Sequence, residues 1–184
     1  MSLYAPLTYD NLMAGLVVYF ERQPRVSLES VEDVEGPGIY ALFYRGGFDV
    51  YRPISGTSEP IYVGKAVPPG SRKGAAVNEN APALRRRIGE HTKSIAEAEN
   101  LAVAEFECRF LAVVPVWITL TERFLIDHYK PVWNLCLDGF GNHDPGAGRR
   151  QGEASWWDTL HPGRPWANKQ VQVRTLGSGL ITKR

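Results

Sequence analysis

Two stretches of sequence stand out, Gly36-Pro37-Gly38-Ile39-Tyr40-Ala41-Leu42-Phe43-Tyr44 and Pro60-Ile61-Tyr62-Val63-Gly64-Lys65-Ala66. Each is a short apolar and aromatic run bounded by glycine or proline, a pattern that predicts a β-strand. If the two strands pair antiparallel, Tyr40 and Tyr62 project from neighbouring positions on one face of the sheet. Two core strands with buried tyrosines would give the same pattern, so the rest of the chain must distinguish the two interpretations.

The composition is that of an ordinary globular chain. With 184 residues, the chain is long enough to bury a core, and we expect a single domain over residues 1–184. Cys108 and Cys136 are too few for a disulfide framework or a zinc site. No secretory signal is visible, and the longest apolar run, at 110–120, contains a proline and is too short to span a bilayer. These features predict a cytoplasmic protein that does not enter membranes.

The charge is distributed unevenly along the chain. The formal net charge is only +1, which does not by itself indicate a nucleic-acid-binding protein. Basic residues nevertheless gather between positions 65 and 93, and such a stripe suits a polyanion bound to one face. A solvated helix face would carry the same charges. The basic residues of this stripe are Lys65, Arg72, Lys73, Arg85, Arg86, Arg87 and Lys93.

Hydrophobic periodicity predicts further core elements. Residues 8–22 are expected to form an N-terminal helix packed on the sheet, and residues 103–114 a mostly buried third strand. A helix that starts near Pro82 would place His91 on its apolar stripe, with Arg87 one turn earlier on the same side. A histidine in this position is either a core-edge residue with a satisfied hydrogen bond or part of a site.

A second helix is expected over residues 119–129 and would carry Glu122. Because Glu122 follows Thr119 by three residues, it fits a capping box as well as it fits a functional carboxylate. Between the two tyrosine strands, residues 46–53 are expected to form an inserted β-ribbon that turns at Gly46-Gly47. Tyr51 and Arg52 would be exposed on this ribbon, either as contacts to DNA or to a second chain, or simply on a solvent hairpin.

Taken together, these features resemble the GIY-YIG nuclease superfamily. Gly38-Ile39-Tyr40 matches the first half-motif, and Tyr62-Val63-Gly64 matches the second with valine in place of isoleucine. The connection between the halves is longer than is usual in the family. The resemblance covers residues 36 to about 135 and is greatest to the type II restriction enzymes that cut GC-rich palindromes such as CCGCGG. The residues at the family's site positions are Tyr40, Tyr62, Arg87, His91, Glu122 and Asn134.

The resemblance implies an α/β (α+β) fold. A small three-stranded, mainly antiparallel sheet would be flanked by helices, with an N-terminal helix, an inserted β-ribbon and a C-terminal extension over residues 136–184. The extension is rich in glycine, arginine and tryptophan, so it either packs as a lid or reads base edges from its loops. The candidate DNA contacts over the whole chain are Lys65, Arg72, Lys73, Arg86, Arg149, Arg150 and Arg164.

The resemblance also implies hydrolysis of phosphodiester bonds. Glu122 is the only carboxylate of the motif set, so one largely hydrated Mg²⁺ or Mn²⁺ ion is expected on it. Arg87 would contact the scissile phosphate, and Tyr40 would act as the general base. Tyr62 and His91 would orient the water or share its proton. Asn134 would hold the site together by hydrogen bonds.

The function implied by the resemblance is site-specific cleavage of double-stranded DNA by a homodimer. Cutting both strands of a palindrome with one site per chain requires two copies related by a dyad. A cognate DNA methyltransferase is expected in the same restriction–modification system. One alternative is a repair or homing nuclease. The other is an inactive GIY-YIG module that binds DNA or RNA, which is less favoured because every motif position holds a residue able to perform its role.

Overall fold

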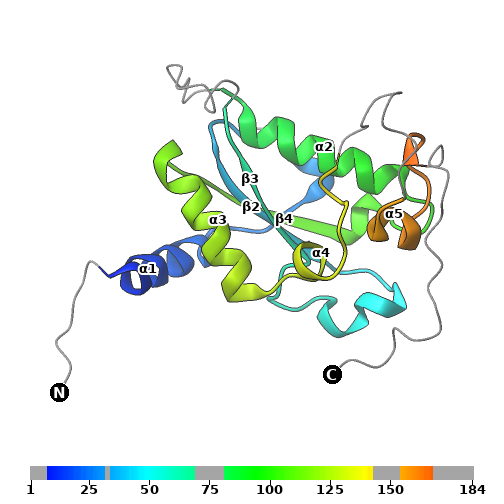
Figure 1. Ribbon diagram of the computed structural model, residues 1–184, viewed down its shortest axis with the longest axis horizontal. Coiled ribbons are helices and arrows are strands. Elements are labelled where there is room, and N and C mark those ends of the chain that lie inside the picture. Colours follow the sequence, from blue (N-terminus) through cyan, green and yellow to red (C-terminus); the bar gives the residue numbers. More distant parts are fainter. Residues whose placement is uncertain (1–7, 32–33, 69–80, 143–153, 168–184) are drawn as a thin grey trace.

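A four-stranded antiparallel sheet forms the centre of the protein (Figure 1). The computed structural model describes residues 8–31, 34–68, 81–142 and 154–167. The strands are β1 (Val26–Ser27), β2 (Gly38–Tyr44), β3 (Tyr62–Ala66) and β4 (Phe106–Ala112), and they lie in the order β1-β4-β2-β3. The predicted class, a mixed α/β fold built on an antiparallel sheet, is therefore confirmed. The two-residue β1 is a fourth strand that the sequence pattern did not reveal.

Helices cover both faces of the sheet (Figure 1). On one face lie α1 (Tyr9–Glu21) and α3 (Pro115–Tyr129), and on the other lie α2 (Ala83–Glu97), α4 (Val132–Leu135) and α5 (Trp156–Leu160). Since side chains alternate along a strand, β2 supplies both cores and is buried at every position. Its residues Tyr40, Leu42 and Tyr44 pack on the α2 side, and Ile39, Ala41 and Phe43 pack on the α1–α3 side.

The helix boundaries decide one open interpretation. The two predicted helices, at 8–22 and from Pro82, are confirmed as α1 and α2. By contrast, α3 begins at Pro115, four residues before the expected start. A proline fits the first helical position because its missing N–H would have no partner there. Thr119 therefore lies inside the helix, and the capping-box interpretation of Glu122 is wrong.

The insertion between β2 and β3 is not the predicted β-ribbon. Residues Asp49–Ile54 instead form a 3₁₀ helix, η2. The cause is Tyr51, whose ring is 1% exposed and packs edge-on to both Tyr44 and Trp133. Trp133 Nε1 donates to the Tyr51 hydroxyl at 2.8 Å. A flat ribbon would have pointed Tyr51 to solvent, so the chain coils inward to bury it.

Residues 154–167, which we call the C-terminal strap, pack onto the core beside the end of α2. The backbone N–H of Glu99 donates to the carbonyl of Pro162 at 2.8 Å, and Asn100 Nδ2 donates to the carbonyl of Leu160 at 2.9 Å. Trp157 is fully buried, and the ring of His161 lies among aromatic side chains. This part of the extension is thus packed like a lid.

We expect His161 to make the fold sensitive to acid. Burial lowers the pKa of His161 to about 4, whereas the unfolded chain binds this proton below about pH 6.5. As the pH falls from 6.5 to 4, the free energy of unfolding should therefore drop by up to about 1.4 kcal/mol per pH unit through this group. Chemical denaturation of the wild-type protein and of His161→Gln across this range checks the prediction. Equal pH slopes in the two proteins would contradict it.

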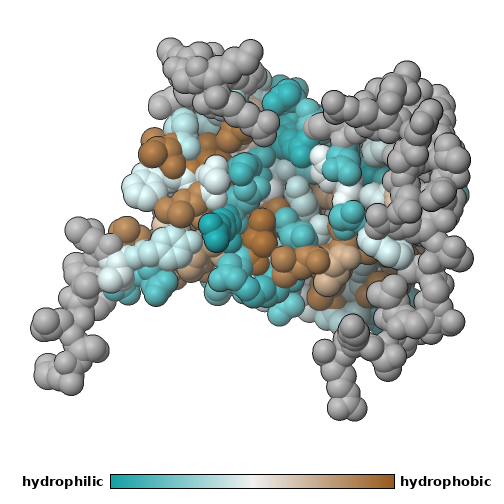
Figure 2. Space-filling view, in the orientation of Figure 1, coloured by the Kyte–Doolittle hydropathy of each residue, from teal (hydrophilic) through white to brown (hydrophobic). Residues whose placement is uncertain are grey.

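An apolar groove lies between α1, the end of β4 and the start of α3. It has a volume of about 410 Å³, and its lining includes Leu12, Tyr19, Val114 and Trp117. Figure 2 shows hydrophobic side chains gathered over the N-terminal end of α3, where Val116 is 77% exposed. Exposed apolar surface of this kind is typical of contact sites. None of the helices in the described ranges is long and apolar enough to cross a membrane.

Candidate active site

The register of β2 and β3 brings the two motif tyrosines together. Tyr40 pairs with Gly64, and Tyr62 pairs with Leu42, so both tyrosines stand on the α2 face at diagonal positions. Their ring centroids are 6.2 Å apart. A β-carbon on Gly64 would overlap the Tyr40 hydroxyl. The glycine of the second half-motif therefore provides the space that the tyrosine of the first half-motif occupies.

Gly64→Ala should displace the Tyr40 ring. We expect a loss of about 1–3 kcal/mol in unfolding free energy, because the added methyl group overpacks the core. Any activity that depends on Tyr40 should fall with it. Gly47→Ala is the matched control, since a β-carbon there meets no atom within 4 Å. Thermal unfolding of both variants checks the prediction, and equal stabilities would contradict it.

His91 completes a buried aromatic group beneath the cleft. It is 1% exposed, and its Nε2 lies 2.6 Å from the Tyr40 hydroxyl. The imidazole stacks on the ring of Phe140, with centroids 4.5 Å apart and planes 17° from parallel. Tyr62 packs edge-on against both rings. The histidine is therefore a buried, hydrogen-bonded group that contacts both motif tyrosines.

The carboxylate of Glu122 reaches the same place from the other face of the sheet. Lys65 pairs with Ile39 in the ladder, so its side chain leaves β3 on the α3 side. There its Nζ lies 2.6 Å from Glu122 Oε2. The side chains of Lys65 and Glu122 remain 30% and 19% exposed. β3 is an edge strand, so groups from both faces can meet around its open edge.

Arg87 projects toward that edge from α2. Its Nη1 donates to Glu90 Oε2 at 2.7 Å, and its Nη2 donates to the carbonyl of Gly141 at 3.2 Å. A β-carbon on Gly141 would lie 3.2 Å from Arg87 Nη2 and 3.3 Å from the Tyr62 hydroxyl. The guanidinium is thus held against Tyr62 by partners on both sides.

Of these groups, Tyr62, Arg87, Lys65 and Glu122 line one cleft, whereas Tyr40 and His91 are buried and do not line it. The cleft has a volume of about 370 Å³, and basic, acidic and phenolic side chains face one another across it. Its lining comes mainly from α2, β3 and α3, and Figure 1 shows β3 at the edge of the sheet between these two helices. Its lining comprises Tyr62, Lys65, Ala66, Val67, Arg86, Arg87, Glu90, Glu122 and Gly141.

Burial dominates the electrostatics of the two tyrosines. It raises the pKa of Tyr40 well above its usual range, and the neighbouring Tyr62 adds to the rise, whereas Arg87 opposes it. The pKa of Tyr62 is also raised by burial, against the lowering effect of Arg87. Burial would lower the pKa of Arg87, but the hydrogen bond to Glu90 and the nearby tyrosines raise it. Both phenols are therefore neutral, and Arg87 keeps its charge.

Asn134 fixes α4 to the edge of β3. Its Oδ1 accepts from the N–H of Val63, and its Nδ2 donates to the carbonyl of Val63, both at 2.8 Å. The amide thereby imitates a neighbouring strand at one residue. The N–H of Trp133 adds a bond to the carbonyl of Ile61 at 2.9 Å. Asn134 thus acts on the backbone that carries Tyr62 and Gly64.

Two carboxylates line the cleft, and since Glu90 is paired with Arg86 and Arg87, Glu122 is the one we consider for a metal ion. Among the described residues, no three histidine, cysteine, aspartate or glutamate side chains form a group that could hold an ion. Magnesium needs only one or two carboxylates when water and substrate phosphate oxygens supply its other ligands. Glu122 already binds a cation, the ammonium of Lys65, at the cleft wall. The donor set therefore fits a hydrated Mg²⁺ and does not fit a zinc site.

The structure places the predicted DNA-contact residues in different environments. Lys65 and Arg86 line the cleft. Arg164 is 1% exposed and forms an ion pair with Asp158 at 2.6 Å. Because its guanidinium lies inside the protein, the structure gives no support to the prediction that Arg164 contacts DNA. Four further candidates lie outside the described residues: Arg72, Lys73, Arg149 and Arg150.

Three residues at the site were not found from the sequence. Glu90 lies one turn after Arg86 on α2 and could have been found from its spacing. Phe140 and Gly141 belong to a glycine-rich segment, and its sequence pattern did not predict a contact with α2. The only hint was a single aromatic residue among glycines, at Gly139-Phe140-Gly141.

Comparison with known protein families identifies the family of the chain. The sequence model of the Eco29kI GIY-YIG domain, a family of restriction endonucleases, matches residues 32–182. The matched range contains the cleft and the C-terminal strap. A search of curated proteins finds no significant match.

Proposed function

Because the chain belongs to the Eco29kI GIY-YIG family of restriction endonucleases, we propose that it hydrolyses double-stranded DNA at a short, GC-rich palindrome in the cleft along β3. The observation that carries the proposal is the meeting of Arg87 and Glu122 in one cleft from opposite faces of the sheet. A phosphate placed between them would have a bidentate guanidinium on one side and a cation-binding carboxylate on the other.

Each cleft residue has a role that its surroundings support. Arg87 would bind the scissile phosphate and stabilise the charge that develops on its non-bridging oxygens. Lys65 would neutralise Glu122 until DNA and the ion enter, and then contact a phosphate. A Mg²⁺ ion on Glu122 would supply Lewis-acid chemistry that neutralises the leaving 3′ oxygen.

Tyr40 would take the proton of the attacking water. Its raised pKa excludes a stable phenolate as the base. The hydrogen bond to His91 supports a relay instead, in which the phenol passes its own proton to His91 Nε2 as it accepts one from the water. Tyr62 would orient the water, and Asn134 would hold the strand beneath it.

A homodimer is part of the proposal. A palindrome has the same sequence on both strands, so the same bond is cut in each strand. Because each chain has one active site, cutting both strands requires a second copy of the chain. The apolar groove between α1 and α3 is a surface that a second copy would bury. A cognate DNA methyltransferase would protect the host genome. Light scattering of the purified protein tests the dimer.

Digestion of unmethylated phage and plasmid DNA, followed by sequencing of the fragment ends, tests the function. Discrete fragments with one shared end sequence would support a site-specific endonuclease and identify its target. Nicked or random products would favour a repair nuclease. A shifted DNA band without cleavage would favour an inactive binding module.

A further inference from the structure

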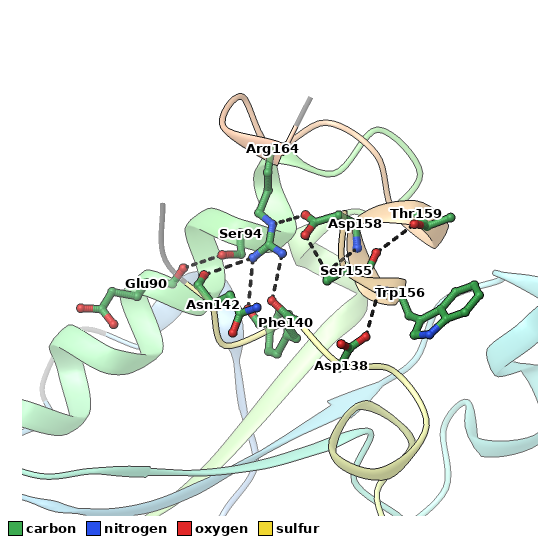
Figure 3. A network of polar contacts seen from close by, with 11 residues as sticks. Glu90, Ser94, Asp138, Phe140, Asn142, Ser155, Trp156, Asp158, Thr159 and Arg164 are labelled. Atoms are coloured by element: carbon green, nitrogen blue, oxygen red, sulfur yellow. Dashed lines mark hydrogen bonds and ion pairs between the residues drawn. The ribbon is translucent and has the colours of Figure 1, made fainter. Parts of the chain in front are cut away.

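The C-terminal strap holds the loop that carries Phe140 and Gly141. Figure 3 shows Arg164 pointing from the strap at the 138–142 loop, between α2 and α5. Its Nη2 donates to the carbonyl of Gly139 at 2.9 Å, and its Nη1 donates to the carbonyls of Phe140 and Asn142, each at 3.3 Å. One guanidinium therefore binds three carbonyls of a four-residue segment.

The position of Arg164 is itself fixed. Its Nε donates to Asp158 Oδ1 at 2.6 Å, and the guanidinium carbon lies 4.5 Å and 4.6 Å from the ring centroids of Trp157 and Trp166. Ser155 donates to the other oxygen of Asp158 at 2.6 Å (Figure 3). Buried charges are costly unless they are paired and hydrogen-bonded, and here the two charges pair with each other while Arg164 donates four hydrogen bonds. The arrangement is specific to the planar, five-donor fork of arginine.

The loop held in this way touches the cleft at two points. Phe140 stacks on His91, the proton acceptor of the proposed relay. The carbonyl of Gly141 accepts a hydrogen bond from Arg87, the proposed phosphate ligand. Arg164 binds the carbonyl of Phe140 and also those of Gly139 and Asn142, which lie on either side of the Phe140-Gly141 pair. A small shift of the loop would therefore move His91 and Arg87 together.

We infer that Arg164 is a positioning residue for DNA cleavage, which acts through the 138–142 loop on His91 and Arg87. This inference rests on the proposed function. It assigns the C-terminal strap to the assembly of the active site instead of to the reading of bases. A displacement of about 1 Å at reacting groups can cost about 100-fold in rate, so a loop contact of this kind is sufficient to control the reaction.

Arg164→Lys is the test variant. Lysine keeps the charge beside Asp158 but cannot bind three carbonyls as a planar fork. We expect the single-turnover cleavage rate at saturating protein to fall about 10- to 100-fold, with DNA affinity unchanged. His161→Gln is the matched control, because His161 anchors the same strap through Asn100 and Tyr51 and does not contact the loop. That control should cleave at the wild-type rate well below its melting temperature.

A second measurement does not depend on cleavage. In proton NMR, the ring resonances of His91 should carry a ring-current shift from Phe140, since the two rings stack. Arg164→Lys should reduce that shift, and His161→Gln should leave it in place. If Arg164→Lys does not fold, Phe140→Leu replaces it. This variant keeps the core filled but removes the stacked ring, so the same fall in rate is expected.

The outcomes separate this inference from the proposed function. A wild-type protein that cuts no DNA would overturn the proposed function. Active wild-type protein together with wild-type rates in Arg164→Lys, or in Phe140→Leu where that variant is used, would overturn the inference alone. Equal losses of cleavage rate in Arg164→Lys and His161→Gln would also overturn the inference, because they would indicate general destabilisation. Weakened DNA affinity with an unchanged rate at saturation would make Arg164 a DNA contact and also overturn it.

Discussion

Glu122→Ala should abolish DNA cleavage and leave the fold intact. The side chain lines the cleft beside Lys65, whereas the other carboxylate of the lining, that of Glu90, is paired with Arg86 and Arg87. We propose that Glu122 holds the metal ion. Loss of the Lewis acid removes several kcal/mol of transition-state stabilisation, which corresponds to a fall of about 10³-fold or more in rate. Single-turnover cleavage of a duplex that contains the target site measures this fall.

The stability of the same variant should change little. The Lys65–Glu122 ion pair is partly exposed, and pairs of this kind contribute about 0–1 kcal/mol. Glu107→Ala is the matched control, because Glu107 is 21% exposed and pairs with Arg25 and Arg45 far from the cleft. Both variants should unfold near the wild-type temperature, and only Glu107→Ala should cleave DNA. A Glu122→Ala protein that unfolds, or one that cuts normally, would contradict the account.

Tyr40→Phe should lose cleavage without losing DNA affinity. The phenol is fully buried and its hydroxyl lies 2.6 Å from His91 Nε2, so the substitution removes one oxygen atom from the proposed relay and leaves the ring in place. General acid–base groups contribute about 10²- to 10⁴-fold to rate, and we expect a fall of that size. The loss of one buried hydrogen bond should cost about 1 kcal/mol of unfolding free energy.

Tyr51→Phe controls for the loss of a buried tyrosine hydroxyl beside a histidine. The Tyr51 hydroxyl also contacts a histidine, His161, and accepts from Trp133, but it lies outside the cleft. This variant should lose stability and keep its cleavage rate. If Tyr40→Phe cleaved DNA as fast as Tyr51→Phe, Tyr40 would have no part in proton transfer.

Local sequence patterns predicted the strands of the site well. The alternation in β2 and β3 placed Tyr40 and Tyr62 on one face, and the register confirms it. The stripe on α2 placed His91 and Arg87 on the sheet side for the same reason, because a helical repeat is a local property. The helix predicted over 119–129 starts too late, because the pattern gives no weight to Pro115 directly after the predicted strand, although proline often begins helices.

Contacts between distant parts of the chain were not predictable in this way. The sequence places Arg164 among the candidate DNA contacts because an arginine on a loop can read base edges. Its partners are a nearby carboxylate, that of Asp158, and three carbonyls more than twenty residues away. Tyr51 looked exposed for a similar reason, since both hydrogen-bond partners of its hydroxyl, Trp133 and His161, lie 82 and 110 residues later in the chain. The spacing of hydrophobic residues along a strand or helix does not indicate contacts between residues so far apart in the sequence.

The rate of DNA cleavage as a function of Mg²⁺ concentration tests the central claim most directly. Wild-type protein at saturation is mixed with a duplex that contains the mapped target, and single-turnover rates are recorded from EDTA to excess Mg²⁺. With Glu122 as the one metal-binding carboxylate, we predict no cleavage in EDTA, then a rise in proportion to the first power of Mg²⁺ concentration, then saturation. Cleavage that continues unchanged in EDTA would contradict hydrolysis by a single metal ion held on Glu122.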